Sequence, residues 1–227
     1  MDRRTILLGA GALTLSSVPI LTGACAQQRP AASGGGPLIT GESCPVTPAQ
    51  TEGPFYFDPR LLRSEIAEEK PGIPLRLRVQ IVESGRCDPL KGSRVDLWHC
   101  DSAGVYSGYE SERSTGETFL RGTQMADAQG LVSFATIYPG WYGGRATHIH
   151  CKARTSDGRE LATQFYFPDT LSELIHKESA YARRGSDWRL TNREDRIFRS
   201  AGAGEATMIE IKRTPSGYDG AIVLTLA

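Results

Sequence analysis

The chain has 227 residues, enough for one domain with a full hydrophobic core. Its 26 basic residues balance 26 acidic ones, which argues against a nucleic-acid-binding protein, because such proteins normally carry a basic excess. Charged residues make up 23% of the chain, so the composition is not that of a disordered protein.

Residues 1–26 are predicted to be an export signal. The pair Arg3-Arg4 precedes an uncharged apolar run from residue 6 to about residue 21, and small residues follow it. This pattern is typical of a secretory signal, and the two arginines make it twin-arginine-like. The alternative is a short membrane anchor, for which the run is on the short side. We therefore expect a periplasmic, extracellular or outer-surface protein.

The end of this signal allows two outcomes for Cys25. The stretch Ala24-Cys25-Ala26 fits a small-x-small cleavage site, which would release the protein. Residues 21–25 also resemble a lipoprotein box, with the leucine one residue too far upstream, and Cys25 would then carry a lipid anchor. The sequence leaves both open.

Residues 27–41 are rich in Gln, Ala, Ser, Gly and Pro and are predicted to be a flexible linker. Residues 42–227 contain no internal repeat and no second linker, so they are predicted to form one domain.

This domain is predicted to be all-β. Leu75, Leu77, Val79 and Ile81 alternate with polar residues, which is the pattern of a half-buried strand. Further strands are expected at residues 94–100, 131–137, 146–153, 161–167, 208–212 and 221–226, and short helices at 59–69 and 170–182. Many short strands between Gly, Pro and Asp turns indicate a β-sandwich of mostly antiparallel strands with long loops and few short helices.

Cysteines Cys44, Cys87, Cys100 and Cys151 follow the signal. Export to an oxidising compartment permits disulfides, and four cysteines allow three complete pairings. The sequence does not choose among these pairings, and buried thiols are the alternative.

The sequence places two histidines two residues apart in a predicted strand. Side chains at positions i and i+2 of a strand point to the same face, so His148 and His150 are expected to lie close enough to bind one metal ion. A His-x-His pair alone is weak evidence, since it is often only a polar strand face. The other two histidines, His99 and His176, are expected to be a buried structural residue and a surface residue.

Tyrosine is the second residue type to consider. A phenolate oxygen is hard and anionic, and it suits Fe(III) better than Zn(II) or Cu(I). Tyr142 precedes His148 by six residues in a Pro/Gly-rich loop, and Tyr106 follows the turn after the second strand. Composition and spacing alone do not select these two among the eight tyrosines.

Several stretches, in order, resemble the intradiol ring-cleavage dioxygenases, the family of protocatechuate and catechol dioxygenases. They are TEGPFY (51–56), VDLWHCD (95–101), GVYS (104–107), FLRG (119–122), FATIYPG (134–140), YGGRATHIH (142–150) and TQFYF (163–167). The ordered set is specific, although no single piece is. It looks most like the protocatechuate-type and secreted members, and its last 50 or so residues match less clearly.

The resemblance implies a mononuclear Fe(III) site. It places Tyr106 and His148 in equatorial positions and Tyr142 and His150 in axial ones, and it selects these tyrosines over Tyr109 and Tyr138. The implied reaction uses O2 to open a catechol-type ring between its two hydroxylated carbons, which yields a cis,cis-muconate-type diacid. Tyr142 would leave the metal and help to remove a substrate proton.

The resemblance also places Arg145 and Gln164 beside the substrate as catalytic residues. Arg145 is always charged and would stabilise negative charge on the substrate ring. Gln164 would hydrogen-bond a ligand or the substrate. Without the resemblance, a solvated surface arginine and an ordinary strand glutamine are the simpler interpretations.

Two other functions fit part of the sequence. A non-catalytic β-sandwich lipoprotein that binds a ligand or partner fits the strand pattern and Cys25. A Zn(II) hydrolase fits His148 and His150, but the sequence shows no nearby Asp or Glu as a third ligand. The choice among catechol, protocatechuate, hydroxyquinol and a lignin-derived fragment stays open, as does the oligomeric state.

Overall fold

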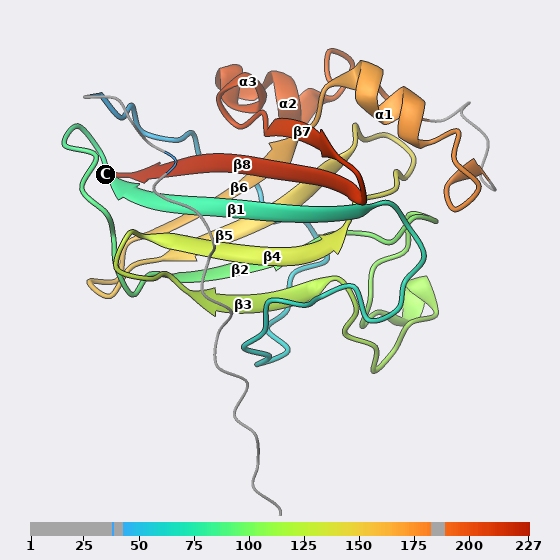
Figure 1. Ribbon diagram of the computed structural model, residues 1–227, viewed down its shortest axis with the longest axis horizontal. Coiled ribbons are helices and arrows are strands. Elements are labelled where there is room, and N and C mark those ends of the chain that lie inside the picture. The colour runs from blue at the N-terminus through green and yellow to red at the C-terminus, as the bar shows by residue number, and fades with distance from the viewer. Residues whose placement is uncertain (1–37, 39–42, 183–188) are drawn as a thin grey trace, which may run out of the picture.

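The structure is a computed structural model that describes residue 38, residues 43–182 and residues 189–227 (Figure 1). The predicted export signal, Cys25 and most of the predicted linker lie outside these residues.

Two four-stranded sheets pack face to face, as predicted (Figure 1). Sheet I has the order β3-β2-β5-β6 and consists of β2 (Arg94–Trp98), β3 (Arg121–Met125), β5 (His148–Arg154) and β6 (Glu160–Tyr166). Sheet II has the order β4-β1-β8-β7 and consists of β1 (Pro74–Glu83), β4 (Leu131–Ile137), β7 (Glu210–Thr214) and β8 (Gly217–Leu226). All neighbours are antiparallel except β1 and β8, which are parallel.

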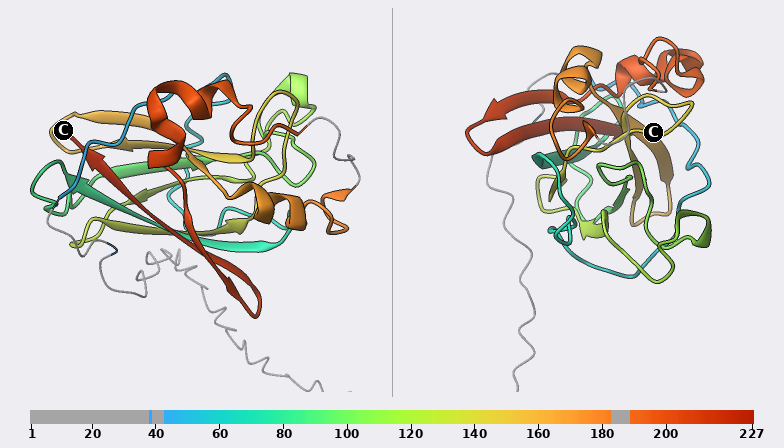
Figure 2. Two further views of the ribbon diagram at one scale, coloured as in Figure 1. Left: turned by 90° about the horizontal axis from the view of Figure 1, so that it is seen from above. Right: turned by 90° about the vertical axis from the view of Figure 1, so that its right-hand side faces the viewer.

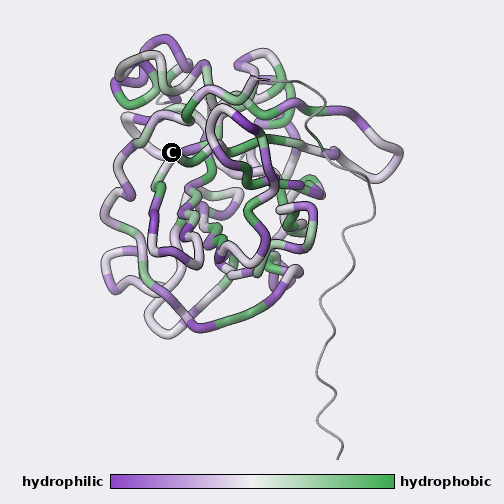
Figure 3. Tube along the Cα trace, turned by 90° about the vertical axis from the view of Figure 1, so that its left-hand side faces the viewer, coloured by the Kyte–Doolittle hydropathy of each residue, from purple (hydrophilic) through white to green (hydrophobic). Residues whose placement is uncertain are grey.

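The core lies between the sheets, where apolar strand residues face each other, and hydrophobic stretches of the trace run through the middle of the molecule in Figure 3. Leu77 and Val79 of β1 are fully buried, and so are Ile149 of β5 and Phe165 of β6. Because strand side chains alternate, the neighbours of these residues point to the outer faces of the two sheets. The outer face of sheet I is therefore where the two histidines of β5 project.

Among the residues that the structure describes, the helices are few and short. They are α1 (Asp169–Ile175), α2 (Arg196–Arg199) and α3 (Ala203–Ala206), grouped on one side of the sandwich, with 3-10 turns at Glu110–Glu112 and Ser200–Gly202 (Figure 2). The helix predicted at residues 170–182 ends at Ile175, so the prediction was right in place and too long.

The helix predicted at residues 59–69 was wrong. Arg60, Glu68 and Glu69 have positive φ angles, which a right-handed helix does not allow. Leu62 and Glu65 instead form isolated bridges to Thr123 and Ala135. Pairing with the sheets therefore overrides a helix-forming composition.

Residues 43–58, which we call the N-terminal strap, cross the outer face of sheet I. The strap is bound to β6 by hydrogen bonds from Gln50 N to Ala162 O and from Gln164 Nε2 to Thr51 O, each 2.8 Å long. Its start is tied to the turn after β1 by the Cys44–Cys87 disulfide. Cys100 and Cys151 are buried thiols, so none of the three complete pairings of the four cysteines occurs.

In the ranges that the structure describes, no helix has the length and apolar character needed to cross a membrane.

Candidate metal centre

His148 and His150 project together from the outer face of sheet I, as the strand alternation predicts. Their Nε2 atoms are 3.1 Å apart, and both side chains are almost fully buried. His148 Nδ1 lies 2.7 Å from Ala146 O and donates its proton there, which leaves the Nε2 lone pair facing His150. His150 is held by stacking on Trp98, with ring centroids 5.0 Å apart and planes 8° from parallel.

Tyr142 reaches the histidines from the loop before β5. Its hydroxyl lies 3.0 Å from His148 Nε2. The loop is anchored upstream by Tyr138, whose hydroxyl bonds Ser172 Oγ at 2.7 Å and whose carbonyl accepts from Tyr181 Oη at 2.8 Å. Tyr138 is therefore a buried structural residue away from the histidines.

Tyr106 completes the cluster from the loop after β2. Phe55 of the strap stacks on the Tyr106 ring, with the ring centroids 4.4 Å apart. The Tyr106 carbonyl accepts a 2.6 Å hydrogen bond from Ser114 Oγ. The Tyr106 ring lies 5.6 Å from that of Tyr142 and 6.1 Å from that of His150. Its hydroxyl is buried but makes no hydrogen bond of acceptable geometry.

The side chains fit a bound ferric ion. Two ligands of one ion, each about 2.1 Å from the metal at a right angle, lie about 3 Å apart. The Tyr142–His148 and His148–His150 contacts, at 3.0 and 3.1 Å, have this spacing. The buried Tyr106 hydroxyl has no hydrogen-bond partner, which costs free energy. A cation bound at its oxygen would remove this cost. Two phenols and two imidazoles are also a donor set that suits Fe(III).

Burial keeps all four groups neutral in the absence of a cation. It lowers the pKa of His148 to about 3, with help from the Arg145 charge, and it lowers the pKa of His150 in the same way. Burial raises the pKa of Tyr142 to about 12 and that of Tyr106 well above its usual value. The imidazoles are therefore ready to act as ligands, while the phenols would need a cation to lose their protons.

Arg145 lies beside this cluster rather than in solvent. Its Nη1 is 3.4 Å from Tyr142 Oη and 3.3 Å from His148 Nε2. Its Nη2 donates to Gln164 Oε1 at 2.5 Å. The Gln164 amide is in turn fixed by its bond to the strap. Arg145 and Gln164, the two residues predicted to face the substrate, thus lie together at the edge of the cluster.

Asp195 is a residue of this site that the sequence did not predict. Its side chain is fully buried, and its Oδ2 accepts from Arg145 Nε at 2.9 Å. The only local signal for Asp195 is its place just before the short helix α2, where it caps the helix. Nothing in the sequence relates that cap to Arg145, fifty residues earlier.

Residues that suit zinc do not gather here. Among the described residues, no group of three or more His, Cys, Asp or Glu is placed to hold a metal ion. A cation between His148 and His150 would therefore need the tyrosines as further ligands. Tyrosine ligands suit Fe(III), whereas zinc sites use His, Cys, Asp or Glu.

The remaining histidines lie away from the cluster. His99 is fully buried and bonded at both ring nitrogens, to Cys100 O and Thr136 Oγ1, as predicted for a structural residue. His176 was expected at the surface, but it is half-buried between the rings of Tyr138 and Tyr181 because the chain after α1 folds back over the Tyr138 loop.

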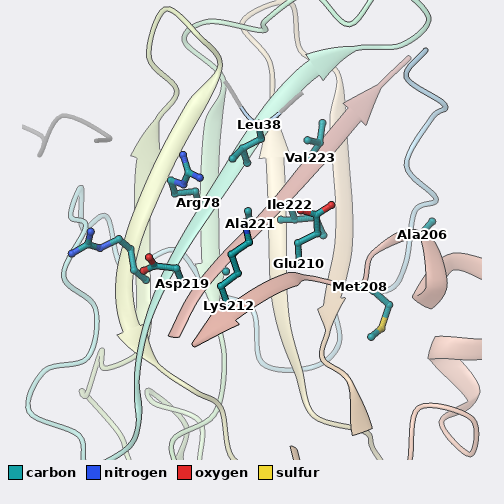
Figure 4. Close-up of a pocket in the computed structure, with 12 residues that line it drawn as sticks. Leu38, Arg78, Ala206, Met208, Glu210, Lys212, Asp219, Ala221, Ile222 and Val223 are labelled. Atoms are coloured by element: carbon teal, nitrogen blue, oxygen red, sulfur yellow. The ribbon is translucent and has the colours of Figure 1, made fainter. Parts of the chain in front are cut away.

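A groove of about 680 Å³ lies on the other side of the sandwich, on the outer face of sheet II (Figure 4). Arg78, Ile222 and Lys212 are among its lining residues, and it includes none of the residues of the cluster. This groove therefore plays no part in the candidate metal centre.

Comparison with known proteins identifies the family of this chain. The family model described as "Dioxygenase" matches residues 51–187. Catechol 1,2-dioxygenase 1 of Acinetobacter lwoffii is 26% identical over 162 residues, which are 61% of this chain and 51% of that protein. The protocatechuate 3,4-dioxygenase beta chain of Burkholderia cepacia is 31% identical over 140 residues, 55% of this chain and 57% of that protein. The chain spans about half, or less, of the length of the first curated relatives it matches.

Solved structures are similar over more of their length. An intradiol ring-cleavage dioxygenase from Tetranychus urticae has a TM-score of 0.74 and 31% identity, covering 80% of this chain and 94% of that one. The dioxygenase domain of a dioxygenase–carbohydrate-binding fusion from Streptomyces sp. SirexAA-E has a TM-score of 0.62 and 27% identity, covering 80% and 97%.

Proposed function

Because the chain belongs to the intradiol ring-cleavage dioxygenase family, we propose that it binds Fe(III) and uses O2 to open the ring of a catechol-type substrate. Tyr106, Tyr142, His148 and His150 would hold the iron. The observation that carries the proposal is the meeting of two phenols and two imidazoles on one sheet face, beside a partly buried arginine. A bound ferric ion would be chelated by the two adjacent oxygens of a catecholate and would make its ring reactive toward O2.

Tyr142 is the proposed proton acceptor. Burial raises the pKa of its phenol to about 12, so the Tyr142 phenolate, which a bound ferric ion would help to form, would be a strong base. It would take a proton from a substrate hydroxyl and remain a neutral phenol at neutral pH. Arg145 Nη1, 3.4 Å from Tyr142 Oη, would steady the phenolate until the proton arrives.

Arg145 is the proposed electrostatic element. Its guanidinium is held on the rim of the cluster by Asp195 and Gln164, so it need not reorganise when negative charge develops on the ring. Gln164 already makes hydrogen bonds through both ends of its amide, and its proposed role is to hold Arg145 in place.

The location of the protein is a separate proposal. The pair Arg3-Arg4 and the apolar run behind it support export by the twin-arginine route, as a released protein or as one anchored at Cys25.

Oxygen consumption tests the proposed reaction. Purified chain loaded with iron would be mixed with catechol, protocatechuate and hydroxyquinol in turn, and O2 uptake and product mass measured together. We expect uptake with at least one of them, with both oxygen atoms of isotopically labelled O2 retained in a ring-opened diacid. Iron-loaded protein that consumes no O2 with any catechol would contradict the proposal.

A further inference from the structure

Asp195 is a buried carboxylate, and the chemistry above uses only its contact with Arg145. It is 0% exposed and lies beyond residue 187, where the match to the family model ends. A buried charge is costly unless it is paired and hydrogen-bonded, so its partners show what it holds in place.

The two oxygens of Asp195 hold two different parts of the chain. Oδ2 accepts from Arg145 Nε and from Ala146 N, both at 2.9 Å. Oδ1 accepts from Ile197 N at 2.7 Å and from Phe198 N at 3.3 Å, which caps α2. One carboxylate thus joins the loop before β5 to the start of a helix about fifty residues later.

The contacts of Oδ2 lead directly to the cluster. The bond to Nε holds the guanidinium so that its two Nη atoms face Tyr142, His148 and Gln164. The bond to Ala146 N fixes the residue whose carbonyl accepts from His148 Nδ1 and so sets the tautomer of that ring. Asp195 therefore controls the direction of the guanidinium and, through one residue, the orientation of His148.

We propose that Asp195 is a positioning residue of the active site, which acts through Arg145 and Ala146 to aim the guanidinium and the His148 ring at the metal site. The inference rests on the function proposed above. It makes the segment around α2 a functional part of the site.

The test compares two variants that keep the helix cap. Asn and Ser are both good caps, so Asp195→Asn and Asp195→Ser should preserve α2. In Asp195→Asn, the amide oxygen can keep the helix cap, which leaves the NH2 group facing Arg145 Nε and Ala146 N. All three nitrogens are donors, so the two hydrogen bonds to Oδ2 are lost. Each variant would be made in the wild-type chain and in an Arg145→Gln background.

The matched control is Asp169→Asn. Asp169 also pairs with an arginine, Arg189 at 3.3 Å, and also binds the C-terminal segment by accepting from Asn192 N at 3.0 Å. Its hydrogen bonds and ion pair within the described residues involve Arg189 and Asn192 and not Arg145, so the variant reports the cost of losing a carboxylate in this region without disturbing the Arg145 guanidinium.

Five quantities would be measured: iron content, melting temperature, the visible absorption of the resting iron-loaded protein, and kcat and KM for a catechol that the wild type cleaves. We expect both Asp195 variants to fold and bind iron, with kcat reduced roughly 10–100-fold. The visible band should shift because Arg145 is no longer held beside Tyr142. In the Arg145→Gln background the same substitutions should cause little further loss of kcat. Asp169→Asn should resemble the wild type in band and kcat.

Several outcomes would overturn the inference. The first is that both Asp195 variants have the same visible band and kcat as the Asp169→Asn control. The second is that the Asp195 substitutions reduce kcat equally in the wild-type chain and in the Arg145→Gln background. The third is that neither Asp195 variant folds, which would make Asp195 a structural residue. A wild type that has neither a visible band nor oxygen uptake would instead overturn the proposed function, so the two failures are distinguishable.

Discussion

Gly140 is the residue at which the loops of the two tyrosines proposed as ligands touch. A Cβ at this position would lie 2.4 Å from Asp101 O and 2.7 Å from Ser102 O. Asp101 begins the turn that leads to Tyr106, and its Oδ1 accepts from Val105 N at 3.0 Å. The close approach of the two backbones therefore sets the spacing of Tyr106 and Tyr142.

Substitution of Gly140 by alanine should separate the two loops. We expect Gly140→Ala to lower the free energy of unfolding by about 1–3 kcal/mol, as for overpacking elsewhere, and to weaken iron binding. Gly143→Ala is the matched control in the same loop, because a Cβ there meets nothing within 4 Å. Urea unfolding and iron titration would check this, and equal behaviour of the two variants would show that the contact at Gly140 is unimportant.

At this scale the sequence predicted the site unevenly. Strand alternation alone predicted that His148 and His150 share a face, because both are in one regular strand. Tyr106 and Tyr142 lie in loops, where no periodicity applies, and were selected only by the family resemblance. Asp195 was missed because its partner Arg145 is fifty residues away and no local pattern relates them.

The N-terminal strap is the element that covers the candidate metal centre. Phe55 stacks on Tyr106, and a Cβ at Gly53 would lie 3.3 Å from His150 Cε1, so the strap touches two of the proposed ligands. Its start is fixed covalently by the Cys44–Cys87 disulfide, which closes a loop with a sequence separation of 43 residues.

Loss of this disulfide should loosen the strap. We expect the double substitution Cys44→Ser and Cys87→Ser to reduce the free energy of unfolding by about 2–4 kcal/mol and to speed the release of iron to a chelator. Mild reductant should have the same effects on the wild type and none on the double variant. An unchanged rate of iron release would mean that the strap holds its place without the disulfide.

The strands were easier to predict than the segments between them. Seven of the eight strands in the described part of the chain were predicted, because each alternates or is continuously apolar. β3 was missed, since RGTQM has only one strongly apolar residue and pairs with β2 through its backbone. The composition of residues 59–69 favours a helix, whereas three positive φ angles and bridges to both sheets exclude one.

Across the whole molecule, the buried histidines make stability depend on pH. Burial lowers the pKa of His99 to about 4, below the value of about 6.5 expected in the unfolded chain. The unfolded state therefore binds more protons between these values. The contribution of His99 to stability is fully present above pH 6.5 and is lost as the pH falls toward 4.

This linkage can be measured on metal-free protein. We expect the wild type to lose roughly 2 kcal/mol of unfolding free energy from His99 alone between pH 7 and pH 5, with losses of the same sign from the other histidines. His99→Gln should flatten the dependence by about that amount. A variant with the pH dependence of the wild type would contradict this assignment of the buried group.

The most direct measurement is the visible absorption of the metal-free chain titrated with Fe(III), made on the wild type, Tyr106→Phe and Tyr109→Phe. A phenolate bound to Fe(III) absorbs visible light, so the wild type and Tyr109→Phe should become coloured at one iron per chain and change colour on addition of catechol. Tyr106→Phe should bind iron weakly and show a diminished band. A wild type that stays colourless with iron, or a Tyr106→Phe variant with an unaltered spectrum, would contradict the account.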